Sequence, residues 1–274
     1  MTTKTISASG NPELANKLVQ QALLETPSQK EEFVETEVIP PSDNLVFLPG
    51  GLLLPTGEVI REAEVRELTG RDEEAIIKAN NLGKSLGVIL QRGTVRIGNQ
   101  QVTEELLDSL LIGDRDALLL GIFKATFGPT TEITCYCAGC SEPKEANINV
   151  STHIKTKLLA DPVEDRVFTV QTKSGMITAK LPVGSTQKEL MANSDKNSSE
   201  LTSILLRETV LSINGMPVYS KDQVQNLGIK DRKIIVEEIN NRAPGPQFDD
   251  ITISCPDCEG DVTVPINFGT LFQF

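Results

Sequence analysis

Aromatic side chains are scarce in this chain of 274 residues: tryptophan is absent, aromatic residues make up 4%, and histidine occurs once. Hydrophobic residues still account for 39%, so a core is expected, built from leucine, isoleucine and valine. The single histidine, His153, has no nucleophile motif beside it. We therefore interpret His153 as a surface residue rather than a catalytic base.

Basic residues are also in short supply. Lysine and arginine number 26 against 38 acidic residues, which gives a net charge of −12 and a pI near 4.7. Nucleic-acid binding needs clustered lysine and arginine, and so does attraction to an anionic membrane surface. The charge argues against both partners and favours docking to basic protein surfaces.

Long apolar runs and recognisable catalytic motifs are missing as well. No segment approaches the 18 consecutive apolar residues of a membrane helix, and the N-terminal MTTKTISASGNPE lacks the apolar core of a signal peptide. We expect a protein made in the cytoplasm, without a membrane span. Glycine-rich nucleotide loops and the Gly-x-Ser-x-Gly elbow are absent from the sequence. The sequence therefore predicts no enzyme, with neither catalytic nor cofactor-binding residues.

Two Cys-x-x-Cys pairs are the main chemical signal. Cys137 and Cys140 lie in ITCYCAGC, and Cys255 and Cys258 lie in ITISCPDC. Each pair places two thiolates on one tight turn, which is half of a tetrahedral Zn²⁺ site. In a reducing compartment such cysteines are more often metal ligands than disulfides. We predict one closed, structural zinc site from all four; an iron–sulfur centre and metal-free buried cysteines remain as alternatives.

A fifth cysteine, Cys135, complicates this assignment. It lies two residues before Cys137 in a β-type run, so both side chains are expected on the same face of a strand. Cys135 is therefore an alternative ligand to Cys137. The two-residue gap to Cys140 favours Cys137, and we expect Cys135 to lie beside the site.

The two halves of the chain resemble each other in the same order. The second cysteine pair lies 118 residues after the first. Upstream of the two pairs, Asp114-Arg115 matches Asp231-Arg232. The segments 86–102 and 201–218 also match, at an offset of 115. We predict an α+β fold made of a tandem duplicated unit of strands, helices and a zinc-ribbon hairpin, arranged with pseudo-twofold symmetry around one four-cysteine zinc site. Chance similarity between two helix-rich segments is the alternative.

The predicted boundaries follow from this repeat: unit 1 spans residues 44–155 with the first zinc knuckle, and unit 2 spans 156–274 with the second. In unit 1 we expect strands at 45–51 and 58–65, one helix from an N-cap at Thr69 to about Gln91, and a helix from Thr103. Asp114 is expected to cap a third helix, which buries Leu118, Leu119, Ile122 and Phe123. In unit 2 we expect two strands followed by helices near 186–193, 198–211, 220–227 and 230–241.

Residues 1–43 are predicted to form an extended N-terminal arm or linker. Within it, Leu14, Leu18 and Ala22 fit one short amphipathic helix, and the residues that follow are acidic and rich in proline. A flexible linker and a peptide that docks on a neighbouring subunit are both open. The apolar tail GTLFQF either packs back on the second ribbon or inserts into a partner.

Three stretches of this sequence resemble a known family. The segment LPGGLLLPTGEVIREAEVRELTGRDEE, then GDRDALLLGIFKATFG, then a strand running into Cys-x-x-Cys, is similar to the T-even phage baseplate hub assembly proteins, which also occur in phage-like contractile injection systems. The closing CPDCEGDVTVPINFGTLF resembles the second knuckle and tail of the zinc-ribbon members. The resemblance implies a structural or assembly protein at the hub of a contractile tail, in a hetero-oligomeric particle.

Three functional hypotheses follow. The first is a baseplate component that stays in the finished phage or contractile particle and contacts other baseplate or tail proteins through its acidic arm and its tail. The second is a hub assembly chaperone that is absent from the mature particle. The third is a zinc-ribbon nucleic-acid-binding protein, which the negative charge disfavours.

Overall fold

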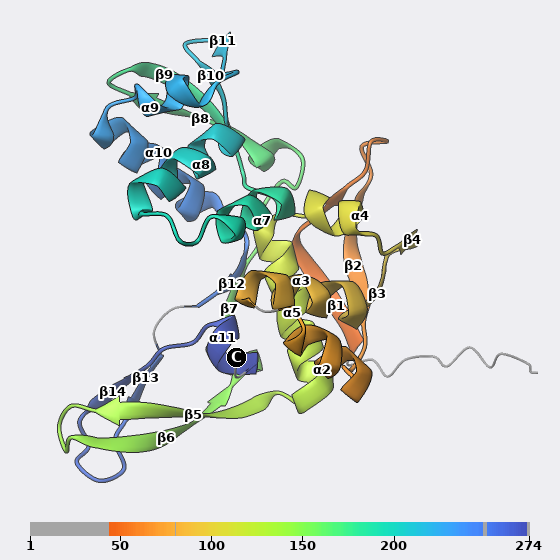
Figure 1. Ribbon diagram of the computed structural model, residues 1–274, viewed down its shortest axis with the longest axis vertical. Helices are drawn as coiled ribbons and strands as arrows, with labels where there is room; N and C mark the ends of the chain where they lie inside the picture. The colour runs from red at the N-terminus through yellow and green to blue at the C-terminus, as the bar shows by residue number, and fades with distance from the viewer. Residues whose placement is uncertain (1–43, 80, 249–250, 273–274) are drawn as a thin grey trace, which may run out of the picture. The chain divides into compact units, whose positions relative to one another are not determined.

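The computed structural model describes residues 44–79, 81–248 and 251–272 (Figure 1). The predicted N-terminal arm, with its amphipathic helix, lies outside the described residues. The described chain is α+β, with short antiparallel sheets and helices, as the sequence predicts at this level.

The first half contains a four-stranded antiparallel sheet in the order β1-β2-β3-β4, with the helices inserted between and after its strands. A two-stranded ribbon, β5-β6, follows. The bounds are β1 Leu45–Leu53, β2 Val59–Val65, α2 Gly70–Ile77, α3 Leu82–Gly93, β3 Thr94–Ile97, β4 Gln100–Gln101, α4 Glu104–Ser109, α5 Ile112–Phe127, β5 Thr130–Cys137 and β6 Glu142–Asn149.

The second half runs through its elements in the same order. Its four-stranded sheet, β8-β9-β10-β11, also encloses two helices between its second and third strands, and a ribbon again comes last. Strand β7, at the boundary of the two halves, pairs antiparallel with β12, which follows α10 late in the second half. The bounds are α6 Val150–His153, β7 Lys155–Lys157, the 3₁₀ turn η3 Glu164–Arg166, β8 Val167–Thr172, β9 Gly175–Lys180, α7 Gly184–Ala192, α8 Ser198–Thr209, β10 Val210–Ile213, β11 Met216–Pro217, α9 Lys221–Gln225, α10 Ile229–Arg242, β12 Gly245–Gln247, β13 Ile251–Ser254, β14 Asp261–Val264 and α11 Phe268–Phe272.

The helix predicted from Thr69 to Gln91 is two helices. Thr69 does cap the first, through a capping box with Asp72. The second begins after Asn81, whose side chain accepts a hydrogen bond from the N–H of Lys84. An asparagine oxygen that satisfies an N–H of the next turn makes a helix start, and the hydrophobic period alone did not reveal it.

Helix α5 begins three residues earlier than predicted. Its N-cap is Leu111, and Asp114 lies within the first turn instead of capping it. The Asp114 carboxylate accepts the N–H groups of Gly50 (2.7 Å) and Gly51 (3.2 Å) at the bulge of β1. Asp114 thereby ties the helix to the sheet, and Gly51 adopts the φ of +74° that this bulge requires.

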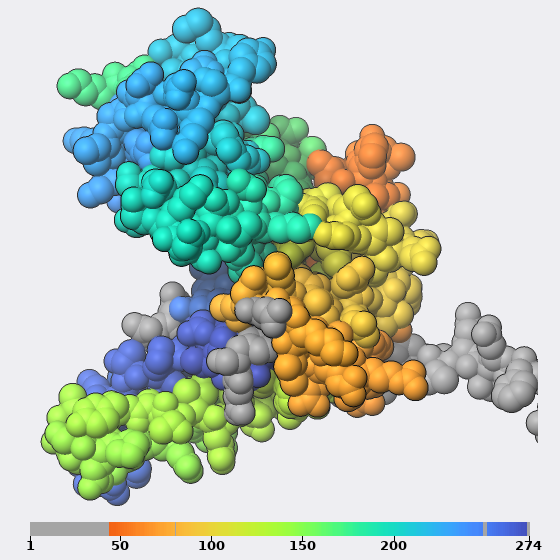
Figure 2. Space-filling model, in the orientation of Figure 1, coloured from red at the N-terminus to blue at the C-terminus, as the bar shows by residue number. Residues whose placement is uncertain are grey.

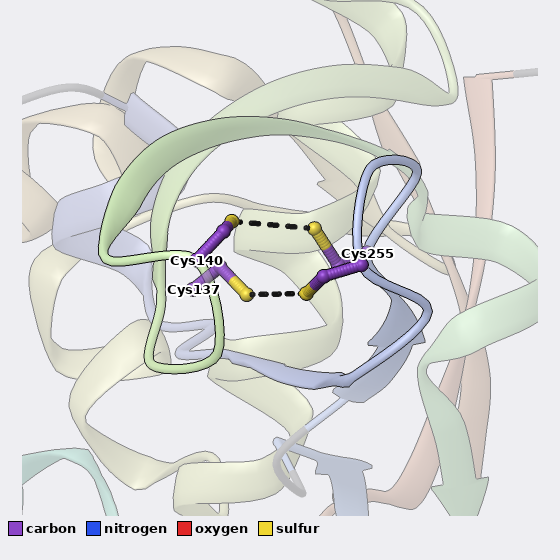
Figure 3. A group of neighbouring side chains, drawn as sticks. Cys137, Cys140 and Cys255 are labelled. Carbon is purple, nitrogen blue, oxygen red and sulfur yellow. Dashed lines mark hydrogen bonds between the residues drawn. The ribbon is translucent and has the colours of Figure 1, made fainter.

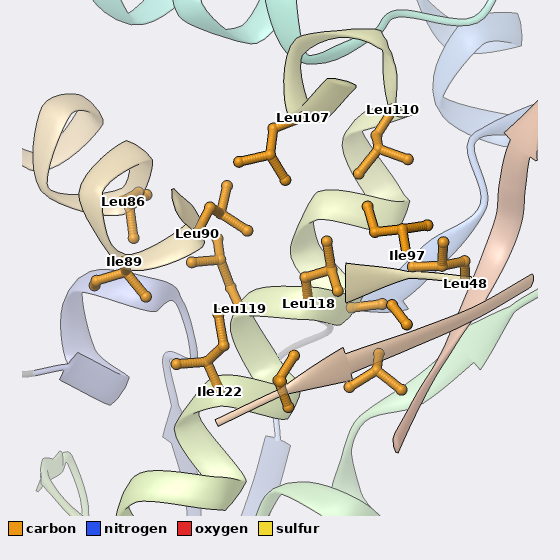
Figure 4. Packing of buried hydrophobic residues seen from close by; sticks show 14 of the residues in the cluster. Leu48, Leu86, Ile89, Leu90, Ile97, Leu107, Leu110, Leu118, Leu119 and Ile122 are labelled. Atoms are coloured by element: carbon orange, nitrogen blue, oxygen red, sulfur yellow. The ribbon is translucent and has the colours of Figure 1, made fainter. Parts of the chain in front are cut away.

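Helix α5 forms the centre of the first core. Leu118, Leu119 and Ile122 are fully or almost fully buried, as predicted, and Figure 4 shows them facing residues of α3 and the sheet. Phe123, the fourth residue of the predicted stripe, is buried in a second cluster with the two ribbons. Leucine, isoleucine and valine dominate both clusters, as the composition demands.

The C-terminal tail packs against the chain itself. Leu271 of α11 is 2% exposed and belongs to the cluster formed by the ribbons, and Phe268 and Phe272 pack against both this cluster and the first core. A third cluster lies under the second four-stranded sheet. Of the two fates proposed for the tail, the described part shows packing within the chain.

Backbone contacts join the two halves. Leu111 forms a β-bridge with Val183, and the N–H of Gly184 donates to the carbonyl of Leu110 at 2.8 Å. The guanidinium of Arg166 donates to the carbonyls of Gly50 and Gly51. The bulge of β1 is therefore held from α5 on one side and from the start of the second half on the other.

The two Asp–Arg pairs make similar hydrogen bonds in the two halves. Asp231 accepts the N–H groups of Lys173 and Ser174 at the β8–β9 turn, as Asp114 does at the β1 bulge. Arg115 and Arg232 each donate to the carbonyl eight residues earlier, of Leu107 and Val224. The shared dipeptide therefore has a physical role: the carboxylate fixes a strand bulge in the first half and a strand turn in the second, and the guanidinium fixes the preceding helix.

Asp114 is expected to make stability depend on pH. Burial raises its pKa to about 6, although the N–H groups of Gly50 and Gly51 favour the charged form. A raised folded-state pKa stabilises the fold when the carboxyl is protonated, so this contribution of about 3 kcal/mol is complete below about pH 4 and is lost as the pH rises through 6. Asp114→Asn removes it. When the pH rises from 5 to 7.5, the free energy of unfolding of the variant, measured in urea, should therefore increase by about 1 kcal/mol relative to that of wild type.

Asp231→Asn is the matched control. Hydrogen bonds, first that of the Ser174 hydroxyl, lower the pKa of Asp231, so its stabilising effect is lost only at acid pH below its ordinary range. The free energy of unfolding of Asp231→Asn should therefore differ from that of wild type by a constant amount between pH 5 and pH 7.5. A difference for Asp114→Asn that is equally constant would contradict the prediction.

Candidate metal centre

Both cysteine pairs lie at the turns of antiparallel ribbons. In the first ribbon, β5 and β6 pair continuously from Thr130↔Asn149 to Cys137↔Glu142, and Cys140 lies in the connecting turn. In the second, β13 and β14 pair up to Ser254↔Asp261, and Cys255 and Cys258 follow in the turn. Alternating apolar residues bury one face of each ribbon, which fixes the register that brings the thiols to the ends.

The two turns share an unusual backbone conformation. Ser141, after Cys140, has φ +56°, and Glu259, after Cys258, has φ +57°. Few residues other than glycine adopt this left-handed region. Both turns therefore bend in the same way directly after their second cysteine, although neither residue there is the glycine from which sequence reasoning could have predicted it.

The four sulfur atoms of the two turns converge (Figure 3). The Sγ atoms of Cys137 and Cys258 are 3.5 Å apart, those of Cys140 and Cys255 are 3.8 Å apart, and all four lie within 4.8 Å of one another. Each contact joins the first cysteine of one turn to the second cysteine of the other. This reciprocal pattern is the one expected at a twofold interface.

These distances fit one metal ion. A Zn–S bond of about 2.3 Å in a tetrahedron separates neighbouring sulfurs by about 3.8 Å. A polynuclear iron–sulfur cluster would place several metal atoms between the thiols and hold them further apart. Four closely spaced cysteines could therefore hold a single metal ion, with no protein ligand missing and no position left open for a substrate.

Electrostatics also favour a cation here. The N–H of Cys140 lowers the pKa of Cys137 to about 6, whereas desolvation and the neighbouring thiols raise the pKa of Cys140. The turn thus favours deprotonation of one thiol, but several thiolates at this separation repel one another. A divalent ion removes that repulsion, which is the usual condition for thiol deprotonation in such sites.

Lys144 is a residue of this site that sequence analysis missed. From β6 its ammonium contacts Glu142 in its own ribbon (2.9 Å) and Asp257 in the opposite turn. These hydrogen bonds, first that of Asp257, raise the pKa of Lys144. Lys144 therefore holds the two ribbons together beside the thiols, and no motif in the sequence marks it.

Cys135 and His153 lie outside the sulfur cluster. Cys135 is buried on the same side of β5 as Cys137, as predicted, but its Sγ contacts the carbonyl of Lys144 at 3.4 Å. The exposed His153 accepts a hydrogen bond from the N–H of Asn149 at Nδ1. Neither side chain belongs to the group that could hold a metal.

Comparisons with known proteins give one match. Residues 53–273, which include all four cysteines of the cluster, match a family described as T4 bacteriophage base plate protein. No curated protein and no solved structure matches the chain. Within the described residues, none of the helices is long and apolar enough to cross a bilayer.

Proposed function

Because this chain belongs to the T4 bacteriophage base plate protein family, we propose that it is a non-catalytic structural component of the hub region of a phage-like contractile baseplate. The family match carries this proposal. The metal centre supports it, because a closed site of four thiols has a structural role and no open position for catalysis.

The ion we assign to Cys137, Cys140, Cys255 and Cys258 is Zn²⁺. Thiolates prefer soft metals, and a tetrahedral S₄ environment is typical of zinc. The sulfur separations of 3.5 and 3.8 Å support a mononuclear ion. The ion would tie two ribbons that are distant in sequence, and since a lone hairpin is marginally stable in water, it would stabilise both.

The organisation we propose is a duplicated unit, 44–155 and 156–274, after an N-terminal arm of residues 1–43. The same order of strands and helices, the matching Asp–Arg contacts and the matching knuckle turns support it. The reciprocal cysteine contacts support a pseudo-twofold relation at the zinc site. By contrast, the bridge from Leu111 to Val183 joins non-corresponding segments, so we restrict the twofold relation to the ribbons.

Its partners are, in this proposal, other baseplate and tail proteins, contacted through the acidic arm and the surface around the C-terminal helix. The runner-up is a transient hub assembly chaperone, which has the same fold but leaves the mature particle. A zinc-ribbon nucleic-acid binder is the weakest alternative, because the net charge of −12 repels phosphate.

Mass spectrometry of purified intact particles separates the first two roles. A structural component is expected at a fixed stoichiometry to other baseplate proteins and to survive high-salt washing. Its absence from mature particles, together with its presence in baseplate precursors, would instead identify the chaperone. The assay needs no variant, so a folding defect does not affect its outcome.

A further inference from the structure

A groove of about 550 Å³ opens between helices α2, α3, α4 and α7. Figure 2 shows the surface of α2 and α3 (orange) next to that of α7 (teal). The side chains of Val88, Leu90, Leu107 and Met191 give it an apolar lining. None of the metal-centre residues contributes to it, so the groove is a separate feature of the molecule.

Small residues line the α2–α3 side of this groove. Ala75 comes from α2, Ala79 from the turn that follows it, and Gly83 and Gly87 from α3. Packing within the chain requires the glycine at Gly83, since a Cβ there would lie 2.8 Å from the Cβ of Met191. At Gly87 a Cβ would meet nothing within 4 Å. Glycine is unfavourable inside a helix, so an uncrowded one facing a groove suits the close approach of another molecule.

Lysines border the groove. Among the described residues, Lys78 and Lys84 have no ion pair, whereas Lys188 is paired with acidic residues of α4. The neighbouring Ile77 and Leu82 are 70% and 46% exposed. An apolar groove bordered by lysines that have no ion pair within the described part of the chain is complementary to an apolar segment flanked by acids.

We propose that this groove binds an acid-flanked amphipathic helix of a neighbouring baseplate protein. Its apolar stripe would lie over Val88 and Leu90, its backbone would approach Gly87, and its acids would pair with Lys78 and Lys84. Helices border the groove, so a helix laid between helices is the geometry that fits. The identity of the neighbour as a baseplate protein rests on the proposed function; the chemistry of the groove does not.

The test uses the full chain and two synthetic helical peptides with the same leucine stripe, one with glutamates and one with lysines on its flanks. Fluorescence anisotropy at low salt is expected to show at least about tenfold tighter binding of the glutamate peptide. Lys78→Glu with Lys84→Glu should remove this preference. Lys230→Glu, an exposed lysine of α10 without an ion pair among the described residues, should leave it unchanged.

A second variant tests the groove itself. Gly87→Leu places a side chain in open space, so the thermal melt is expected to be unchanged or raised, while binding of the glutamate peptide falls at least about tenfold. Binding that resists both this variant and the lysine reversals would overturn the proposal, as would equal affinity for the two peptides or no binding of either.

A third peptide, residues 11–37 of this chain, tests the competing occupant. If it binds the groove more tightly than the glutamate peptide, the site belongs to the chain's own N-terminal segment and the assignment to a neighbour is wrong. Failure of the proposed function is distinguishable, because absence of the protein from particles leaves these binding results untouched.

Discussion

Cys255→Ser is expected to abolish binding of the proposed zinc ion and to lower the free energy of unfolding by several kcal/mol. Cys255 is 1% exposed and its sulfur faces that of Cys140. Structural zinc contributes on the order of 10 kcal/mol in small zinc-dependent domains, which is comparable to the whole stability of a typical protein. Elemental analysis should show one zinc per wild-type chain and a large loss in the variant. A chelator should lower the melting temperature of wild type and leave that of the variant unchanged.

Cys135→Ser is the matched control for this experiment. Cys135 is also buried in the ribbon cluster but contacts a carbonyl instead of the other thiols. The control should retain its metal and its response to the chelator, with at most a small loss of stability. If Cys255→Ser retained a full equivalent of zinc, Cys255 would not be a ligand; if chelation left the wild-type melt unchanged, the metal would have no structural role.

Gly113→Ala is expected to have the second largest effect. A Cβ at this position of α5 would lie 1.8 Å from the carbonyl oxygen of Pro244, a backbone atom, and 2.8 Å from the Cα of Gly245. Gly245 begins β12, which is paired with β7, so it cannot move aside without breaking that sheet. The better helix propensity of alanine is worth about 1 kcal/mol, and the clash should outweigh it with a net loss of about 3 kcal/mol or more.

Gly87→Ala gives the opposite expectation. It is also a helical glycine, but a Cβ there meets nothing within 4 Å, so the variant should gain about 0.5–1 kcal/mol. Urea unfolding of both variants measures the difference. Equal effects of the two substitutions would show that the approach of α5 to Pro244 is looser than described.

Local patterns predicted much of the fold. Thr69 and Thr103 cap helices as expected, because Thr103 directly precedes Glu104 and Glu105, and Thr69 has Asp72 at the third helical position, where a capping box needs it. The apolar stripe of α5 could be predicted from the sequence because helical spacing alone specifies it. The break between α2 and α3 was not, since it depends on how Asn81 satisfies one N–H.

The four cysteines of the candidate metal centre could be predicted from the sequence, and their surroundings could not. A two-residue gap between cysteines is a local signal, and Cys137 and Cys140 could be recognised from it. Lys144 and Asp257 are 113 residues apart and meet only because two ribbons cross at the thiols. Similarly, the role of Asp114 is set by a distant bulge, so its position near a helix start suggested a cap instead.

The separation of 115 residues between Cys140 and Cys255 has a consequence for synthesis on the ribosome. Until Cys255 and Cys258 have been made, the first turn can offer only two sulfurs, too few to enclose an ion. If the proposed zinc site forms, metal binding would therefore be a late step that requires both ribbons. Chains that stop before Cys255 would then lack half of the ligands and stay metal-free.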